Sequence, residues 1–435
     1  MNDFYDIRGY EYFKREAHKL LIETLSDFFG VEVRLHFKPL SELQHYGIDI
    51  TQDPGRTVYP VDSNTVIVLC NAVSDGERYY LGIKFTANHI GEETKIFNVT
   101  SKAINACLNQ CVYSDFKNAI SYMGDRLIVR LIGKQLEPAG YSSSKVMHMV
   151  DKFVGLRSTT FEGKHFSTGL LLTRSLHDFK KKGDEGRSGE LLTLNVANGY
   201  LKKINNRYWY MADGFRTFYV TDLKSDIRHM FVYTDVEGNH FKNMVLYKTL
   251  KGGDVLIRTE AGREVSVITS DGVEFINQEN CWRYRDYELL KKRILKELNL
   301  NEDVYNSLLY YVLHCSKNDI SSLIWMPKDI NKYTESIKEG TANKLAESTL
   351  NIVDQAYSSL LKRILSSDGA TVIRPTGEIE AYGCMVETGQ ARVSGVKGTG
   401  ETAASILAKN GIAIKISQDG TIKVFLNGKN VPIKF

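Results

Sequence analysis

The 435-residue sequence predicts an α/β (α+β) protein with more than one domain. Three observations support this. Up to about residue 150, stretches with apolar residues at helical spacing alternate with strand-like runs. Over residues 153–286, strand-like runs with tight-turn signals dominate. Over residues 287–435, predicted helices and strands alternate again. We therefore expect an N-terminal α/β unit over 1–152, a β-rich unit over 153–286 and a third domain over 287–435.

The composition is that of an ordinary globular protein, with 43% hydrophobic and 25% charged residues and a net charge of +4. A mildly basic chain permits an anionic ligand, and we predict no direct nucleic-acid binding. The longest apolar runs, such as Thr65–Cys70, have the length of strands, so no contact with a membrane is expected. The start of the chain has no secretory pattern, and the six cysteines lack paired spacing, which favours reduced thiols and a cytoplasmic location.

The first unit is expected to begin with an amphipathic helix over residues 9–29, because its apolar residues recur at helical spacing. Gly30 ends this helix and the strand Val31–Leu35 follows. Two further apolar runs, Tyr79–Phe85 and Leu127–Ile132, are predicted to be strands.

The second unit is expected to be rich in strands. Its strand-like runs include Leu170–Leu172, Tyr208–Tyr210 and Arg216–Val220. A meander over residues 255–275 follows, with Ala261-Gly262 and Asp271-Gly272 as turn signals.

The third domain is expected to open with the helices Tyr287–Leu298 and Glu302–Cys315, the second capped by Asn301. Near the end of the chain, Ile412–Ile416 and Ile422–Phe425 flank an Asp-Gly pair, which predicts a hairpin. No zinc-binding spacing of histidines is present, so we predict no zinc site.

Two short motifs in this domain point to chemistry. Ser367–Ala370 places a carboxylate and a glycine at the entrance of a strand, where a divalent cation and a sugar hydroxyl can be held. Lys397–Ala404 is a glycine-rich turn that opens a helix, where free N–H groups suit phosphate. Together they describe a site for a nucleoside triphosphate. Each motif alone is more typical of an ordinary turn or loop.

From Asn301 to Phe435 the order of motifs resembles the diadenylate cyclase family (DisA N-terminal, or DAC, domain). The matching elements are Asp-Gly-Ala at 368–370, Gly-Glu-Ile-Glu-Ala at 377–381 and Gly-Thr…Ala-Ala at 398–404. Upstream, Ile320–Met326 matches the family's first central strand and Ala346–Leu365 its long helix. The resemblance implies a DAC-like mixed β-sheet flanked by helices.

The resemblance also implies the site residues. Asp368 would be the catalytic residue and the ligand of Mg²⁺ or Mn²⁺. The residues implied to bind the nucleotide are Gly369, Ala370, Gly383, Lys397, Gly398, Thr399, Gly400, Glu401 and Thr402. In the family two protomers face each other, each contributing one nucleotide, so a homodimer is implied.

The chain departs from the family where Arg-His-Arg is replaced by Gly400-Glu401-Thr402. Three groups that grip a triphosphate are thereby missing, and phosphoryl transfer depends mainly on positioning and charge stabilisation. The candidates to replace them are Lys397, Lys409, Lys415 and Arg392.

Three interpretations remain open. The first is a nucleotidyltransferase that makes a dinucleotide signal, with a linear, triphosphate-bearing dinucleotide as one product hypothesis because ring closure lacks its cations. The second is an inactive sensor that binds a nucleotide or a small nucleotide signal and regulates a partner. The third is a scaffold with an empty pocket. The resemblance further implies that the first two units act as regulatory and sensor-like regions, and that the protein controls an effector encoded nearby in bacterial antiphage signalling.

Overall fold

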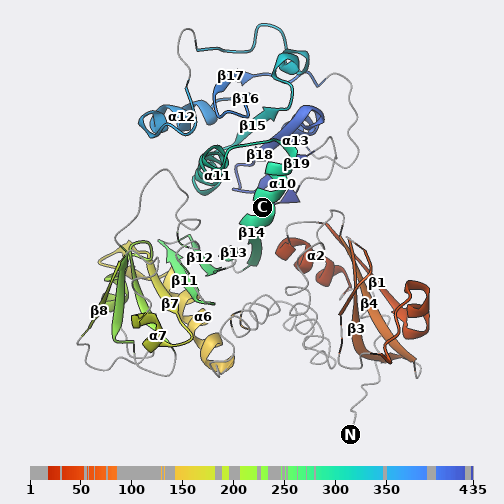
Figure 1. The fold of residues 1–435 in the computed structure, drawn as a ribbon, viewed down its shortest axis with the longest axis vertical. Coiled ribbons are helices and arrows are strands. Elements are labelled where there is room, and N and C mark those ends of the chain that lie inside the picture. Colours follow the sequence, from red (N-terminus) through yellow and green to blue (C-terminus); the bar gives the residue numbers. More distant parts are fainter. Residues whose placement is uncertain are drawn as a thin grey trace. The chain divides into compact units, whose positions relative to one another are not determined.

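The computed structural model describes residues 18–29, 32–52, 56, 58–62, 64–74, 77–85, 129, 132, 143–181, 189–194, 206–222, 227–233, 246, 250, 253–261, 263–270, 272–278, 281–345, 350–388, 398–426 and 433–434. The chain folds into two compact units. Unit 1 comprises Met1–Asp235 and Thr249–Arg285, and unit 2 comprises Val236–Lys248 and Asp286–Phe435. Both contain sheets flanked by helices, which confirms the mixed α+β class (Figure 1). The predicted three-part division stays a prediction.

Unit 1 contains a four-stranded antiparallel sheet in the order β1-β4-β3-β2. Its strands are β1 (Val33–Pro39), β2 (Val58–Pro60), β3 (Thr65–Ser74) and β4 (Glu77–Phe85). Helix α2 (His18–Phe29) contacts β1, and η2 (Leu40–Tyr46) follows that strand. The rings of Phe29 and Phe85 meet edge to face at 5.2 Å. The predicted first helix is thus confirmed from His18 onward, and its expected start lies outside the described residues.

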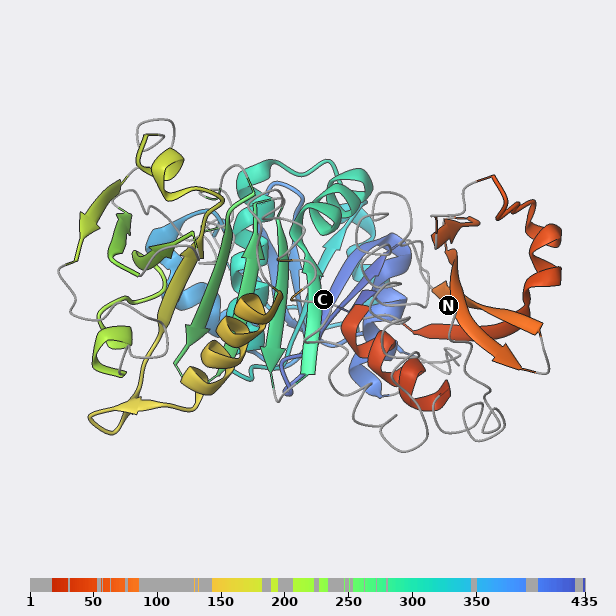
Figure 2. The same ribbon diagram turned by 90° about the horizontal axis from the view of Figure 1, so that it is seen from below.

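A second sheet of unit 1 has eight strands in the order β14-β13-β12-β11-β7-β9-β10-β8. Its strands are β7 (Thr168–Leu172), β8 (Gly189–Thr193), β9 (Thr217–Thr221), β10 (His229–Tyr233), β11 (Val255–Glu260), β12 (Glu264–Thr269), β13 (Val273–Gln278) and β14 (Cys281–Asp286). The antiparallel run β11–β12–β13 confirms the predicted meander. Helix α6 (Ser143–Arg157) packs on β11 and β12, as Figure 2 shows in yellow against green.

Two predicted strands of unit 1 are wrong. Tyr208–Tyr210 lie in the short helix α8 (Asn206–Tyr210), where Trp209 is buried between the rings of Phe153 and Tyr219. Val129 and Ile132, from the other predicted strand, are helical and both buried. Residues three apart share one face of a helix, so an apolar run can satisfy a helical face as well as a strand. The remaining short elements of unit 1 are β5 (Thr160–Phe161), β6 (Lys164–His165) and α7 (Leu176–Lys181).

Unit 2 is organised around a six-stranded mixed sheet in the order β17-β16-β15-β18-β19-β20. Its strands are β15 (Ser322–Pro327), β16 (Ala370–Ile373), β17 (Ile379–Cys384), β18 (Gly411–Ile416), β19 (Ile422–Leu426) and β20 (Ile433–Lys434). β15 and β16 are parallel and the other neighbours are antiparallel. The predicted hairpin is confirmed as β18 and β19, whose turn is closed by a bond from Thr421 N–H to Asp419 Oδ1 of 3.0 Å.

Helices cover both faces of this sheet. Alternate residues of β18 and β19 point to opposite faces. On one face, Ile414 and Val424 line a small apolar cavity of about 10 Å³ with side chains of α10 (Tyr287–Glu297) and α11 (Glu302–Lys317). On the other face, Ala413 and Phe425 share an apolar core with α13 (Thr399–Leu407). The remaining helical elements of unit 2 are η4 (Ile330–Ser336), η5 (Gln355–Tyr357), α12 (Ser358–Leu365) and η6 (Ala408–Asn410).

The helix boundaries of unit 2 agree with the sequence in one region and differ in another. Asn301 caps α11 as predicted, because its side chain accepts the N–H of Asp303 at 2.9 Å. The long helix expected over Ala346–Leu365 is wrong, since within its described part, residues 350–365, the α-helix α12 begins only at Ser358. Asn351 instead forms an isolated bridge with Glu378 beside β17, so the chain before α12 is bound to the sheet edge. Among the described residues, no helix combines the length and apolar character needed to cross a membrane.

Candidate functional site

One end of the central strands of unit 2 gathers polar residues from distant parts of the sequence. Leu323 of β15 is paired with Ala370 of β16 on one side and with Lys415 of β18 on the other. Ser321 and Asp368 each lie two residues before these paired positions, at the start of parallel strands, and therefore at the same sheet end as Lys415. The Lys415 Nζ donates to Ser321 Oγ at 2.7 Å, which fixes this juxtaposition.

The Asp368-Gly369 turn lies against strand β17. Gly369 has φ +89°, and a Cβ there would lie 2.7 Å from the carbonyl carbon of Gly383 and 2.9 Å from Cys384 N. Only glycine permits this approach and this backbone conformation. The Asp368 side chain is exposed, and its Oδ1 accepts the N–H of Gly369 at 2.9 Å. The turn therefore brings the predicted residues Asp368, Gly369 and Gly383 together.

Two predicted nucleotide-binding residues, Ala370 and Lys397, do not appear as open side chains of the described site. Ala370 is fully buried in the apolar core beneath α13, so neither its side chain nor its backbone is open to a ligand. Lys397 lies outside the described residues, as does Arg392, which the sequence offered as a replacement cation.

The amino-terminal end of α13 supplies the remaining predicted residues. Gly398 is its N-cap, exposed and with φ +101°, and it makes no side-chain capping bond. The Thr402 Oγ1 donates to Gly398 O at 3.0 Å, so this hydroxyl is engaged by the backbone. The first N–H groups of a helix have no acceptor within it, and those of Thr399, Gly400 and Glu401 are in this position.

Lys415 joins the Asp368 turn to the start of α13. A Cβ on Gly400 would lie 2.8 Å from Lys415 Cε and 3.5 Å from Nζ, so the lysine stem runs directly past Gly400. Burial lowers the pKa of the Lys415 amine below its usual value, and the nearby carboxylates of Glu401 and Asp368 oppose this by raising it. The amine is therefore within electrostatic range of both predicted site carboxylates.

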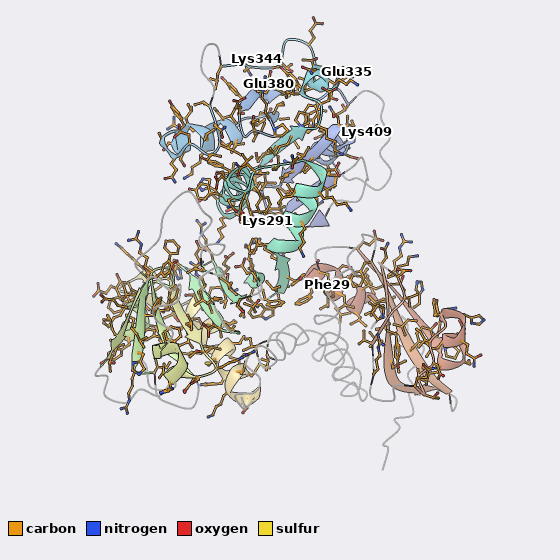
Figure 3. All side chains as sticks on the ribbon, in the orientation of Figure 1. Phe29, Lys291, Glu335, Lys344, Glu380 and Lys409 are labelled. Carbon is orange, nitrogen blue, oxygen red and sulfur yellow. The ribbon has the colours of Figure 1, made fainter. Side chains whose placement is uncertain are left out.

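The sequence missed Lys415 as a site residue and gave it only as one of four candidate cations. The sequence pattern that could have identified Lys415 is its position two residues after Ala413. Residues two apart on a strand lie on the same face, so Lys415 lies on the face of β18 that α13 covers. Lys409 is exposed in η6 beyond the other end of α13, and Figure 3 shows it apart from Lys344 and Glu380.

Glu401 is paired rather than open to a ligand. Its Oε1 accepts a hydrogen bond from Lys423 of β19, and the two side chains are 17% and 19% exposed. Lys423 lies opposite Lys415 in the β18–β19 ladder. The described site thus holds two lysines and two carboxylates, with formal charges that cancel.

Binding of a metal ion at this site would require phosphate groups of a bound nucleotide in addition to protein side chains. The described residues contain no group of three or more His, Cys, Asp and Glu side chains suited to a metal. Mg²⁺ commonly binds one or two carboxylates together with water and substrate phosphates. The single exposed carboxylate of Asp368 fits Mg²⁺ or Mn²⁺ held in this way.

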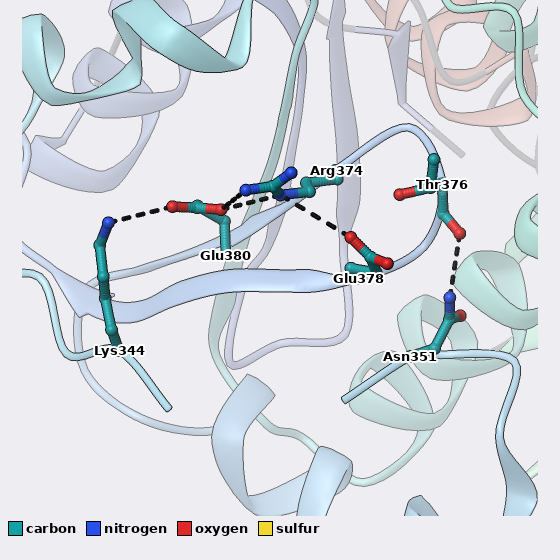
Figure 4. A network of polar contacts seen from close by, with 6 residues as sticks. All are labelled: Lys344, Asn351, Arg374, Thr376, Glu378 and Glu380. Atoms are coloured by element: carbon teal, nitrogen blue, oxygen red, sulfur yellow. Dashed lines mark hydrogen bonds and ion pairs between the residues drawn. The ribbon is translucent and has the colours of Figure 1, made fainter. Parts of the chain in front are cut away.

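A second polar network lies on the neighbouring edge strand (Figure 4). Glu380 Oε2 accepts two bonds from Arg374, at 2.8 and 2.6 Å, and its Oε1 accepts from Lys344 at 3.1 Å. Arg374 also lies 3.9 Å from Glu378, while Asn351 Nδ2 donates to Thr376 O at 3.0 Å. This network holds β17 and its flanking segments in place beside the Asp368 turn.

Comparisons with known proteins give a limited result. No family model and no curated protein matches this sequence. A double mutant of DacA from Staphylococcus aureus is similar at 22% identity and a TM-score of 0.24, over 29% of this chain and 84% of that one. A hypothetical membrane spanning protein from Bacillus cereus is similar at 18% identity and a TM-score of 0.27, over 34% of this chain and 74% of that one. Both likenesses are weak and concern the fold alone.

Proposed function

We propose that unit 2 is a nucleotidyltransferase that joins nucleoside triphosphates into a dinucleotide signal with Mg²⁺ or Mn²⁺. The observation that carries the proposal is the convergence of the Asp368 turn and the start of α13 around Lys415, although these segments are separate in the sequence. This convergence joins the two motifs that each suggested part of a nucleotide site. The order of those motifs, which resembles that of diadenylate cyclases, supports the same reading.

In this proposal each residue has a limited role. A bound divalent ion supplies charge neutralisation at the phosphates. Asp368 would hold the ion and orient a 3′-hydroxyl. The hydroxyl oxygen would attack the α-phosphorus of the second nucleotide and release its proton to water, as the bond to pyrophosphate breaks. The backbone N–H groups of Thr399, Gly400 and Glu401 receive phosphate oxygens. A linear, triphosphate-bearing dinucleotide is the product after one such step, and a second step would close a ring.

The test is incubation of the full chain with each ribonucleoside and deoxyribonucleoside triphosphate and Mg²⁺ or Mn²⁺. Pyrophosphate release and mass spectrometry of the products are the measurements. We expect a dinucleotide from the wild type and none from Asp368→Asn. Glu335→Gln, which changes an exposed carboxylate elsewhere in unit 2, is the matched control and should retain activity. No product from any nucleotide would remove the enzyme proposal.

The second candidate is a nucleotide sensor without catalysis. The pairing of Glu401 with Lys423 favours it, because a carboxylate stands at the helix start where the resemblance implies a cation. A sensor should bind its nucleotide as tightly with Asp368→Asn as without it, and should release no pyrophosphate. Equilibrium dialysis of both proteins with labelled nucleotides separates the two candidates.

The cellular role is also part of the proposal and rests on the sequence resemblance alone. The protein would act as a homodimer in the cytoplasm, with its N-terminal region as the sensor. Its nucleotide product would control an effector protein encoded nearby in defence against phage. Plaque assays with and without the gene and its neighbours test this role. Equal plaquing by diverse phages would contradict it.

A further inference from the structure

The described cationic side chains of this site belong to strands and not to helix α13, which follows the glycine-rich turn. Within the described first turn of α13, the residues Thr399–Thr402 include no lysine or arginine. The lysines that face this turn are Lys415 on β18 and Lys423 on β19. Their positions are directly opposite in the ladder, so they lie on the same face of the sheet.

These two lysines differ in how their charge is matched. Lys423 is bound to the carboxylate of Glu401. The Lys415 Nζ has a neutral hydroxyl, Ser321 Oγ, as its hydrogen-bond partner among the described residues. Among the described residues of this site, the Lys415 amine is therefore the cation that a phosphate can engage without breaking an ion pair.

Gly400 is what allows the Lys415 amine to reach this position. A Cβ at residue 400 would overlap the lysine stem, 2.8 Å from Cε. An arginine at residue 400 would need the same space. Any side chain at residue 400 would therefore displace the flexible end of the Lys415 side chain from its present position.

We infer that Lys415 binds the phosphate group of the site's ligand, and that Gly400 is the residue that leaves room for its side chain. The inference rests on the proposed nucleotide-binding function and assigns its cationic contact. It also identifies the ligand class as one with a phosphate near the start of α13, whichever base it carries.

The surroundings of Lys415 predict how binding depends on pH. The charged groups that face it are Glu401 on α13 and Asp368 before β16, with Lys423 on β19 behind Glu401. Burial outweighs the carboxylates and holds the Lys415 pKa below the usual 10.5. The amine therefore loses its proton at a lower pH than an exposed lysine, and phosphate binding should weaken as the pH rises through that value.

The test measures binding of Mg²⁺–ATP and of inorganic tripolyphosphate to the full chain by calorimetry. Lys415→Met keeps the stem and removes the charge, and we expect binding about 10- to 100-fold weaker for both probes. Lys415→Arg should retain binding and lose the alkaline decline, because arginine stays protonated. Gly400→Arg with Lys415→Ala, which removes the stem that a Cβ at residue 400 would meet, should recover part of the loss by returning a cation to the helix.

Thermal unfolding of each variant is the control that the variant is correctly folded. Lys415→Met removes an amine that burial disfavours in its charged form, so its unfolding temperature should stay equal or rise. A role in packing alone would instead lower stability and leave the pH profile unchanged. Unchanged affinity of Lys415→Met, with the wild type binding ATP, overturns the inference and leaves the proposed function standing. Absence of wild-type binding to every nucleoside triphosphate and to tripolyphosphate overturns both.

Discussion

Gly369 and Gly383 lie in such close contact that a Cβ on Gly369 would be 2.7 Å from the carbonyl carbon of Gly383. The two residues belong to segments that the sequence linked only through the order of their motifs. Their contact seats the Asp368 turn on β17, so the position of the proposed catalytic carboxylate depends on the edge strand.

Gly369→Ala should destabilise unit 2 by more than about 2 kcal/mol, because it combines a left-handed backbone with a clash against backbone atoms. Gly340→Ala is the control, since Gly340 has φ +74° but a Cβ there meets nothing within 4 Å. It should cost only about 1 kcal/mol. Scanning calorimetry of the full chain measures both, and equal costs would show that the contact with Gly383 is not what demands glycine.

Glu401→Gln should tighten binding of Mg²⁺–ATP by roughly fivefold, because it removes a negative charge beside the phosphate site and leaves Lys423 unpaired. Lys423→Met is the opposite change and should weaken binding. Calorimetric titration of both variants is the measurement. Equal weakening in both would mean that the Glu401–Lys423 pair acts by holding α13 on the sheet.

Acid should destabilise unit 2 through Glu380. Burial alone would raise its pKa, but the hydrogen bonds from Arg374 and Lys344 outweigh burial and hold the pKa below 4.5. The carboxylate therefore contributes stability above pH 4.5, and this contribution is lost as the pH falls through the lowered pKa.

Glu380→Gln should reduce the free energy of unfolding at pH 7 by about 1–3 kcal/mol and should remove part of the decline in acid. Glu378→Gln is the matched control, because Glu378 is 3.9 Å from Arg374 and its side chain is 37% exposed. Its effect should be within about 1 kcal/mol. Urea titrations between pH 3 and 7 compare the variants, and an unchanged acid slope in Glu380→Gln would contradict the assignment.

The cysteines should differ in reactivity. Burial raises the pKa of the Cys315 and Cys384 thiols to about 11, while Cys281 is exposed. Of these three of the six cysteines, a maleimide at pH 8 should modify Cys281 first and spare Cys315 and Cys384 until the protein is unfolded, because the thiolate is the reactive form. Peptide mapping by mass spectrometry provides the measurement. Early labelling of Cys384 would mean that the Asp368 turn opens from β17.

Local patterns were enough to predict much of the fold. The meander of β11–β13, the cap at Asn301 and the Asp-Gly hairpin follow from turn chemistry and spacing within a few residues. The errors occurred where tertiary packing decides. Tyr208–Tyr210 have strand-forming residues but form a helix because Trp209 fills the core beside Phe153.

The candidate site shows the same limit. Asp368 and Gly369 were predicted from their motif, and the structure brings them to Gly383. The contact of Lys415 with Gly400 was not predictable, because it depends on the register between β15 and β18 and on how α13 crosses that face. The position of Lys415 within the apolar run 412–416 predicts only which face of the sheet its side chain lies on.

The bond between Lys415 and Ser321 joins residues 94 positions apart. No short peptide from this chain can reproduce the site, since its parts meet only when β15, β16 and β18 are paired. Ligand binding should therefore appear in one step during refolding, when β15, β16 and β18 have paired. It should disappear as soon as β18 separates from β15.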